Sequence, residues 1–321
     1  MTSNLLNLAA IALYLLTWVL ITRCVKANMK TLDQRTKSSE IYFTLWAFAL
    51  IAHFASIVQP FITSNEISFH FISLGSYVML FISLILYIST LNHKIQALAV
   101  IILPFTILSI VVLLFSNVTS NNDIQLNSGL GLHILVSLFA YSTLMLAAVQ
   151  AALLAIQNNF LHKRLKNPNQ SNFIRTLPAL EDMEYFLFHL IGIGLVLLSL
   201  SLFSGFYYLD NLFGSSVAHK TILSIISWVI FSLLLFGRWK YGWRGKTAVR
   251  WTITGFIVLA LSFFGSKFIQ EFIIDKDVSA VTSTHQKITF KNTPPSFLPV
   301  LSINKQTTHL ITRVPESNLL G

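Results

Sequence analysis

Eight long apolar stretches, separated by short polar segments, dominate the pattern of the chain. Each is close to the roughly 20 residues that a helix needs to cross the hydrocarbon core of a bilayer. They cover residues 5–22, 41–62, 69–91, 95–115, 130–156, 185–209, 217–236 and 249–268. Lysine and arginine occur only near the ends of the last two stretches. The pattern therefore predicts an all-α integral membrane protein, a bundle of about eight transmembrane helices.

The composition agrees with this pattern and argues against most classes of soluble protein. The chain has 321 residues, of which 54% are hydrophobic and 11% charged, and its mean hydropathy is +0.69. Globular domains carry about 25% charged residues, so a soluble enzyme, a nucleic-acid-binding protein and a disordered scaffold are all poor fits. A single cysteine, Cys24, excludes a disulfide framework and a cysteine-rich metal site.

The distribution of basic residues predicts the orientation of the helices. The loops after the first, third, fifth and seventh stretches hold most of the lysine and arginine. Such loops face the cytoplasm in membrane proteins, so both termini are expected on the outer side. Residues 1–272 then form an eight-span domain, and residues 273–321 a polar, disordered outer tail. The formal net charge of +10 is expected on the cytoplasmic face, where it would also attract anionic lipid.

Histidines are the candidate functional residues inside the apolar stretches. His53 lies near the middle of the second stretch, His133 at the outer end of the fifth, and His189 in the cytoplasmic third of the sixth. Neutral imidazole is a good axial ligand for haem iron, and a haem needs only one or two such ligands in an apolar slot. We therefore take all three as candidate haem and metal ligands. The alternative is that each one bonds a neighbouring helix and serves packing.

Acidic residues are missing from the interior of the stretches. Ion-coupled transporters usually need buried carboxylates. Metal hydrolases need a carboxylate as a ligand or as a base. Their absence argues against both classes of protein.

Two short segments also need an interpretation. Segment 237–245, GRWKYGWRG, interleaves aromatic and basic residues at a predicted cytoplasmic helix end. It is typical of an interfacial aromatic belt with positive anchors, although Arg238 or Arg244 could instead pair with the carboxylates of haem propionates. Segment 201–205, SLFSG, is a small-residue face suited to close helix packing, and no chemistry is assigned to it.

Three segments resemble a known family. Segment 132–141, LHILVSLFAY, resembles the histidine-containing helix of the cytochrome c assembly, or haem-handling, membrane family, which includes CcsA-type and HemX-type proteins. Segments 180–205 and 219–245 resemble the family's next two helices. The closest likeness is to the small eight-span YpjD-type branch of the bacterial inner membrane, and it extends to about residue 272.

The resemblance implies non-covalent binding of b-type haem and its transfer during cytochrome c assembly, in the bacterial inner membrane. By position, His133 matches the family's outward-facing haem ligand, and His53 resembles its ligand within the membrane. The synthases also carry a tryptophan-rich outer loop and further histidines. Here segment 205–213 has no tryptophan, and segments 237–238 and 264–267 stand where those histidines are expected. The resemblance therefore implies a haem-binding relative that is not an enzyme and has no thioether-ligase activity of its own.

Several arrangements and partners follow as hypotheses. His53 and His189 would hold one haem inside the bundle, although their depths differ by about two helical turns. His133, with His219 as a partner, would hold a second haem near the outer face. The expected partners are haem, the lipid bilayer, and cytochrome c maturation proteins or a tetrapyrrole-synthesis enzyme, but no nucleic acid. The alternatives are a scaffold or regulator of a cytoplasmic tetrapyrrole enzyme and, less favoured, a permease for an apolar anion.

Overall fold

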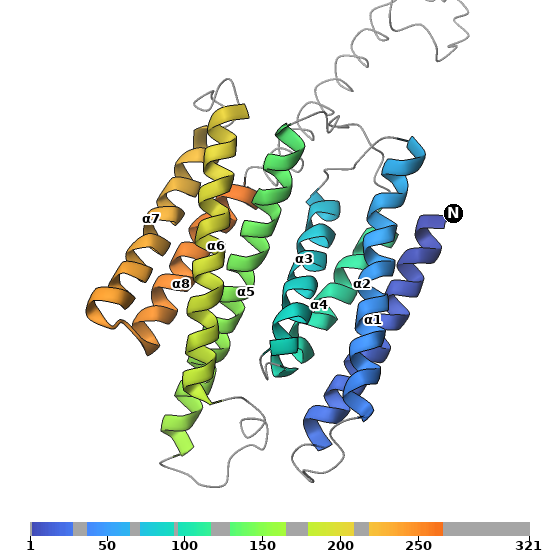
Figure 1. Ribbon diagram of the computed structural model, residues 1–321, viewed down its shortest axis with the longest axis horizontal. Coiled ribbons are helices and arrows are strands. Elements are labelled where there is room, and N and C mark those ends of the chain that lie inside the picture. Colours follow the sequence, from blue (N-terminus) through green and yellow to red (C-terminus); the bar gives the residue numbers. More distant parts are fainter. Residues whose placement is uncertain are drawn as a thin grey trace, which may run out of the picture. The chain divides into compact units, whose positions relative to one another are not determined.

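The computed structural model describes residues 2–27, 37–64, 71–92, 96–116, 129–164, 179–208 and 218–265 (Figure 1). These residues form α1 (Thr2–Ala27), α2 (Lys37–Ser64), α3 (Phe71–Asn92), α4 (Gln96–Phe115), α5 (Gly129–Arg164), α6 (Leu180–Tyr208), α7 (Ala218–Tyr241) and α8 (Gly245–Ala260), which a π-helical turn continues over Leu261–Gly265. The described part contains no strand, and all eight α-helices are long and apolar enough to cross a membrane. The predicted all-α bundle is confirmed. The predicted tail lies outside the described residues.

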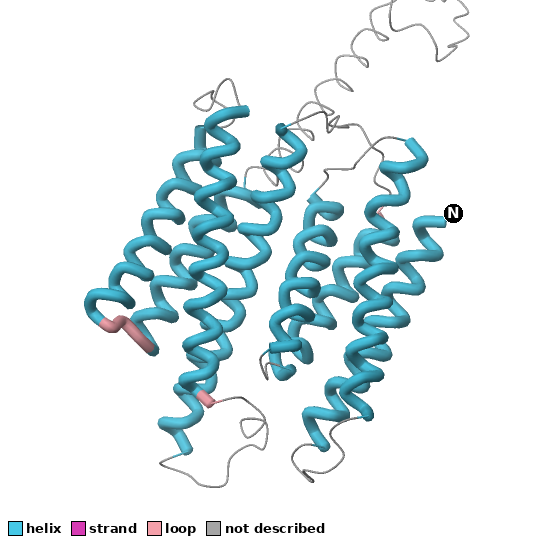
Figure 2. The backbone as a smooth tube through the Cα atoms, viewed as in Figure 1, coloured by secondary structure: helices cyan, strands magenta, loops and turns pink. Residues whose placement is uncertain are grey.

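The helices extend beyond the predicted apolar stretches. α5 continues to Arg164, α6 begins at Leu180, and only residues 242–244 connect α7 to α8 (Figure 2). A helix satisfies its own backbone hydrogen bonds, so it can continue past the hydrocarbon layer. Long basic side chains can then reach water from the helix ends. Residues expected in loops, such as Arg238 and Lys240, are therefore helical.

The helices pack in two groups of four with the same order. In the first group α1 packs against α2 and α4, and α3 packs against the same two helices. In the second group α5 packs against α6 and α8, and α7 packs against the same two helices. Contacts between α3 and α5 join the groups, which stand beside each other in Figure 1.

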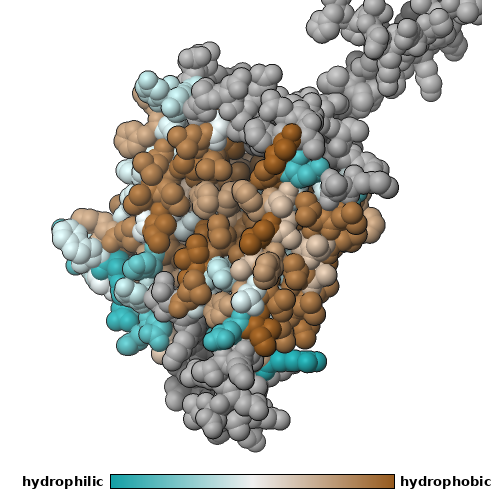
Figure 3. All heavy atoms as spheres, turned by 45° about the vertical axis from the view of Figure 1, so that its right-hand side comes forward, coloured by the Kyte–Doolittle hydropathy of each residue, from teal (hydrophilic) through white to brown (hydrophobic). Residues whose placement is uncertain are grey.

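The interior of the bundle contains polar side chains, and many large apolar side chains are exposed. The buried face of α1 carries Asn7, Tyr14 and Thr17, whereas Leu8 and Leu16 are exposed. Figure 3 shows a broad apolar surface with hydrophilic side chains gathered towards one end. Lipid tails are as apolar as leucine, so exposed leucines cost nothing in a membrane, and the contacts between helices can be polar.

Glycines let α6 approach α5 closely at two places. A Cβ atom on Gly194 would lie 2.5 Å from Cδ2 of Leu144, and one on Gly205 would lie 2.9 Å from Cε1 of His133. Any larger residue at these positions would force the helices or the side chains to move. The contact at Gly205 places His133 directly against α6.

Candidate functional site

His133 lies one turn into α5 and is half-buried against α6. Its Nδ1 is 2.9 Å from the Oγ of Ser204 on α6. One turn along α5, the Oγ of Ser137 donates to the His133 carbonyl over 2.6 Å. The same Oγ lies 2.7 Å from the Oγ of Ser201. No hydrogen bond reaches the Nε2 of His133 from the described residues. The contact with Ser204 therefore fixes one ring nitrogen of His133.

The donor groups around His133 can be compared with what a bare metal ion and a haem would each require. Within the described ranges, no three histidine, cysteine, aspartate or glutamate side chains converge on a point that could hold one. Haem differs because its porphyrin already holds the iron, which requires only one or two axial ligands from the protein. His133 fits that requirement.

His53 has the opposite arrangement of its ring nitrogens. It is fully buried in the middle of α2, and its Nε2 lies 3.0 Å from the Oγ of Ser76 on α3. Its ring meets Tyr14 of α1 edge-on, with centroids 5.9 Å apart. The unpartnered nitrogen is Nδ1, which is buried. A haem iron bound by His53 would have to reach this buried nitrogen or displace the contact between Nε2 and Ser76.

His189 does not share a site with His53. It lies on the exposed face of α6, where its ring contacts the ring of Tyr185, with centroids 5.1 Å apart. His53 is enclosed by α1, α2 and α3, so the geometry does not bring the hypothesised pair together. His219 lies at the start of α7, and its side chain is outside the described residues.

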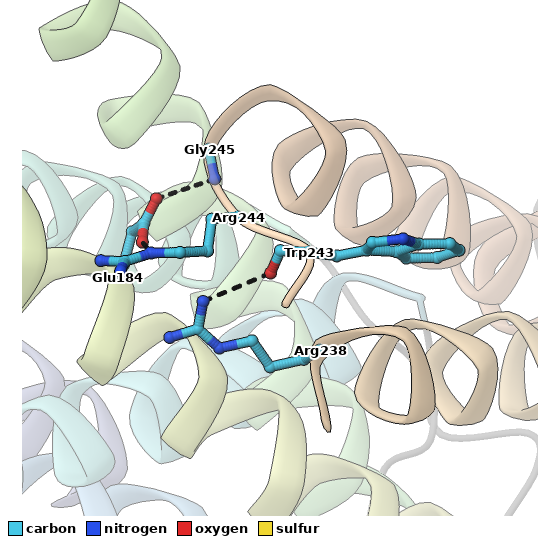
Figure 4. Close-up of polar contacts among 5 residues, drawn as sticks. All are labelled: Glu184, Arg238, Trp243, Arg244 and Gly245. Atoms are coloured by element: carbon cyan, nitrogen blue, oxygen red, sulfur yellow. Dashed lines mark hydrogen bonds and ion pairs between the residues drawn. The ribbon is translucent and has the colours of Figure 1, made fainter. Parts of the chain in front are cut away.

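Glu184, on the second turn of α6, binds the start of α8. Its carboxylate accepts a hydrogen bond of 2.8 Å from Nε of Arg244 and another of 2.8 Å from the backbone N–H of Gly245 (Figure 4). We call these three residues the Glu184 clasp. The hydrogen bond to Glu184 raises the pKa of Arg244 above its ordinary value, so the guanidinium stays charged. A carboxylate at a helix N-terminus is also favoured by the helix dipole.

Arg238 belongs to the same connection between α7 and α8. Its Cζ lies 4.6 Å from the centre of the Phe188 ring, and its Nη1 donates to the Trp243 carbonyl over 3.3 Å (Figure 4). The Trp243 ring covers Gly237, where a side chain would clash.

Two glycines make the connection short. Gly242 and Gly245 have φ angles of +66° and +55°, which few other residues adopt. The glycines and tryptophans of segment 237–245 thus build a tight turn between two helices.

The two arginines cannot serve a haem at His133. Arg244 binds α6 at Glu184, whereas His133 binds α6 at Ser204. At 1.5 Å per residue these points are about 30 Å apart along the helix. Arg238, which covers Phe188, lies instead at the level of His189. A role for either arginine with haem propionates therefore stays a prediction, and it would concern a haem near His189.

Sequence reasoning missed two sets of residues. Ser201, Ser204 and Gly205 were assigned only to packing, although they face His133 across the α5–α6 contact. Glu184 was placed in a loop, whereas it is a helical residue with only 4% of its surface exposed. Two features of the sequence could have indicated these residues. Ser201 and Ser204 are small residues spaced three apart, and Glu184 is a carboxylate directly before an apolar stretch.

The chain is similar to proteins of cytochrome c biogenesis. A family model described as cytochrome C assembly protein matches residues 67–274. The inner membrane protein YpjD of Escherichia coli K12 is 33% identical over 202 residues, which cover 63% of this chain and 75% of that protein.

Two further relatives match shorter parts of the chain at lower identity. Protein HemX of Brevibacillus brevis is 27% identical over 135 residues, 41% of this chain and 48% of HemX. The cytochrome c biogenesis protein CcsA of Chlamydomonas reinhardtii is 28% identical over 142 residues, 44% of this chain and 38% of CcsA. No solved structure matches the chain significantly. His133, His189 and both arginines lie inside the segment that the family model matches, whereas His53 lies before it.

Proposed function

Because the chain belongs to the cytochrome c assembly family, we propose that this multi-pass membrane protein binds haem and passes it on during cytochrome c assembly. The haem is b-type and non-covalent, and Nε2 of His133 is its axial ligand. When bound, haem supplies the iron-porphyrin that the assembly needs. The chain supplies the ligand and an apolar surface, and it forms no thioether bonds. The membrane is the bacterial inner membrane, with the basic loops in the cytoplasm and the tail in the periplasm.

The arrangement of His133 is the observation that carries this proposal. Metal-binding histidines almost always donate their other ring N–H to a neighbouring group. Here Nδ1 lies 2.9 Å from Ser204 Oγ, and Nε2 has no hydrogen-bond partner among the described residues. The ring of His133 is half-buried, whereas that of His53 is fully buried. His53 and His189 stay predicted ligands, and the structure offers them no shared haem.

The visible absorption spectrum of the detergent-purified protein, with and without added haem, tests the proposal. We expect a Soret band in the wild-type protein and a haem affinity at least about tenfold weaker in His133→Ala, because an axial ligand is lost. His53→Ala and His189→Ala should bind haem nearly as well as the wild type. His285→Ala is the matched control, because His285 lies in the tail and has no assigned role.

Two results would contradict the proposal. Absence of a Soret band in the wild type, even after haem is added, would remove haem binding altogether. An unchanged affinity in His133→Ala together with a lost band in His53→Ala would move the site to the first group of helices.

A second function is supported by the basic end of α7 and α8. Lys240, Lys246 and Arg250 are exposed there, on the side predicted to be cytoplasmic. These side chains suit the docking of an acidic soluble partner such as a tetrapyrrole-synthesis enzyme. Capture of such an enzyme by haem-free protein, and its loss in a Lys246→Glu, Arg250→Glu variant, would favour a regulatory scaffold over haem transfer.

A further inference from the structure

The contact between α5 and α6 contains four hydrogen bonds that link four residues, including His133, in a ring. We call this set of bonds the circuit. Its members are His133 and Ser137 on α5, and Ser201 and Ser204 on α6. The four distances are 2.9 Å from His133 Nδ1 to Ser204 Oγ, 2.9 Å from Ser204 Oγ to the Ser201 carbonyl, 2.7 Å between the Oγ atoms of Ser201 and Ser137, and 2.6 Å from Ser137 Oγ to the His133 carbonyl. The circuit thus begins and ends on His133.

The two backbone carbonyls determine the direction of every bond in this circuit. A carbonyl oxygen only accepts, and a serine hydroxyl has a single hydrogen to donate. Ser137 uses its hydrogen on the His133 carbonyl, and Ser204 uses its hydrogen on the Ser201 carbonyl. Ser201 must therefore donate to Ser137. By the same reasoning the hydrogen between His133 and Ser204 belongs to Nδ1 of His133.

We propose that Ser204 is a positioning residue that holds His133 in the Nδ1–H tautomer, with the lone pair of Nε2 presented to a ligand. In the other tautomer, Ser204 would have to withdraw its hydrogen from the Ser201 carbonyl, and the circuit would lose one bond. The identity of that ligand as haem iron rests on the proposed function. The assignment of the tautomer rests on the hydrogen bonds alone.

Gly205 is the reason that the circuit can close. A Cβ atom at this position would lie 2.9 Å from Cε1 and 3.5 Å from Nδ1 of the His133 ring. Without a side chain at Gly205, the Cε1 edge of the ring can approach α6 and bring Nδ1 to Ser204. Segment 201–205 therefore combines a packing role with the orientation of the imidazole, and a hydrogen bond from Nδ1–H makes Nε2 a more basic ligand.

Nitrogen-15 NMR of histidine-labelled, haem-free protein tests this directly, since protonated and unprotonated ring nitrogens differ in chemical shift and in their couplings to ring hydrogens. The His133 signals are assigned by their loss in His133→Gln. We expect Nδ1 to be protonated and Nε2 unprotonated in the wild type. Ser204→Ala should lower the ratio of the Nδ1–H to the Nε2–H tautomer several-fold, and Ser204→Thr should restore it because threonine keeps the hydroxyl.

Ser199→Ala on the same helix is the control, because Ser199 bonds Trp228 and not His133. It should leave the tautomer of His133 unchanged. A wild-type His133 protonated at Nε2, or an unchanged tautomer ratio in folded Ser204→Ala, would overturn the inference. The protonated nitrogen of wild-type His133 can be measured even if a variant does not fold, so the predicted tautomer is tested in either case.

Haem titration of the same proteins separates this inference from the proposed function. If haem binds, Ser204→Ala should weaken the affinity about 10- to 100-fold, and Ser204→Thr should recover it. An Nδ1–H tautomer in a protein that never binds haem would leave the role of Ser204 intact and refute haem binding. Wild-type haem affinity in Ser204→Ala, despite a changed tautomer, would show that the orientation of His133 does not serve the haem.

Discussion

The three membrane histidines differ in which ring nitrogen is available and in what encloses it. His133 has Nδ1 bonded to α6 and Nε2 without a described partner, whereas His53 has Nε2 bonded to Ser76 and an unpartnered Nδ1. His189 is exposed on α6. A porphyrin needs room around the ligating nitrogen, and we propose Nε2 of His133 as that nitrogen because its ring is half-buried and held through Nδ1. The chemistry of each histidine therefore depends on its partner across a helix contact.

Gly205→Ala tests this conclusion without changing any hydrogen-bonding group. The new Cβ would lie 2.9 Å from Cε1 of His133, so the ring must move and the bond to Ser204 must lengthen. We expect haem affinity to fall about tenfold or more, as it does when a partner of a metal ligand is lost, measured by titration of the Soret band. Gly192→Ala is the control, because a Cβ there has no neighbour within 4 Å. Equal affinities of the two variants would contradict the argument.

At the scale of helices, two features hold the second group of helices together. One is the packing between α5 and α6, and the other is the Glu184 clasp. Gly194 lets Leu144 of α5 pack directly on the backbone of α6. At one end of α6, the Glu184 clasp holds the start of α8 through Arg244 and Gly245. The contacts between helices thus come from glycines and from a few polar groups, as expected where apolar side chains gain nothing by leaving lipid.

Gly194→Ala should therefore destabilise the protein. Its Cβ would lie 2.5 Å from a methyl carbon of Leu144, and overpacking of this kind costs about 1–3 kcal/mol. Thermal unfolding of the detergent-solubilised protein should show a lower midpoint temperature than the wild type. Gly192→Ala, on the same helix and in open space, should be neutral or slightly stabilising because alanine favours helix by about 1 kcal/mol. A reversed order of the two midpoints would show that α6 does not approach α5 so closely.

At the scale of the whole molecule, one face of the bundle shows a broad apolar surface with hydrophilic side chains towards one end (Figure 3). Arg244 and Lys246 lie at the connection between α7 and α8. The excess of basic residues in such segments predicts that this end faces the cytoplasm, and that both termini lie on the opposite side.

Cysteine labelling tests this orientation, and the composition of the chain makes it simple because Cys24 is the only native cysteine. In a Cys24→Ser background, Lys246→Cys should react with a membrane-impermeant maleimide in inverted vesicles but not in intact cells. Ser302→Cys, in the tail, should react from the outside of intact cells. A membrane-permeant maleimide should label both variants and serves as the control. The reverse pattern would invert the predicted topology.

The sequence by itself determined the class of fold and the number of helices. An apolar run of about 20 residues is a local property, and a helix is the structure that satisfies its own backbone within lipid. The sequence also singled out His53, His133 and His189, because ionisable side chains are costly in a membrane. These predictions need no knowledge of which helices touch.

Only the tertiary structure decided how these residues are used. Helices in lipid are apolar on all sides, so the sequence pattern does not reveal which face turns inward or which helices pair. The structure placed Ser204 beside His133, enclosed His53 between α1 and α3, left His189 on an exposed face, and bound Arg244 to Glu184. Each of these contacts joins residues that are distant along the chain, and each depends on how far one helix rotates against another.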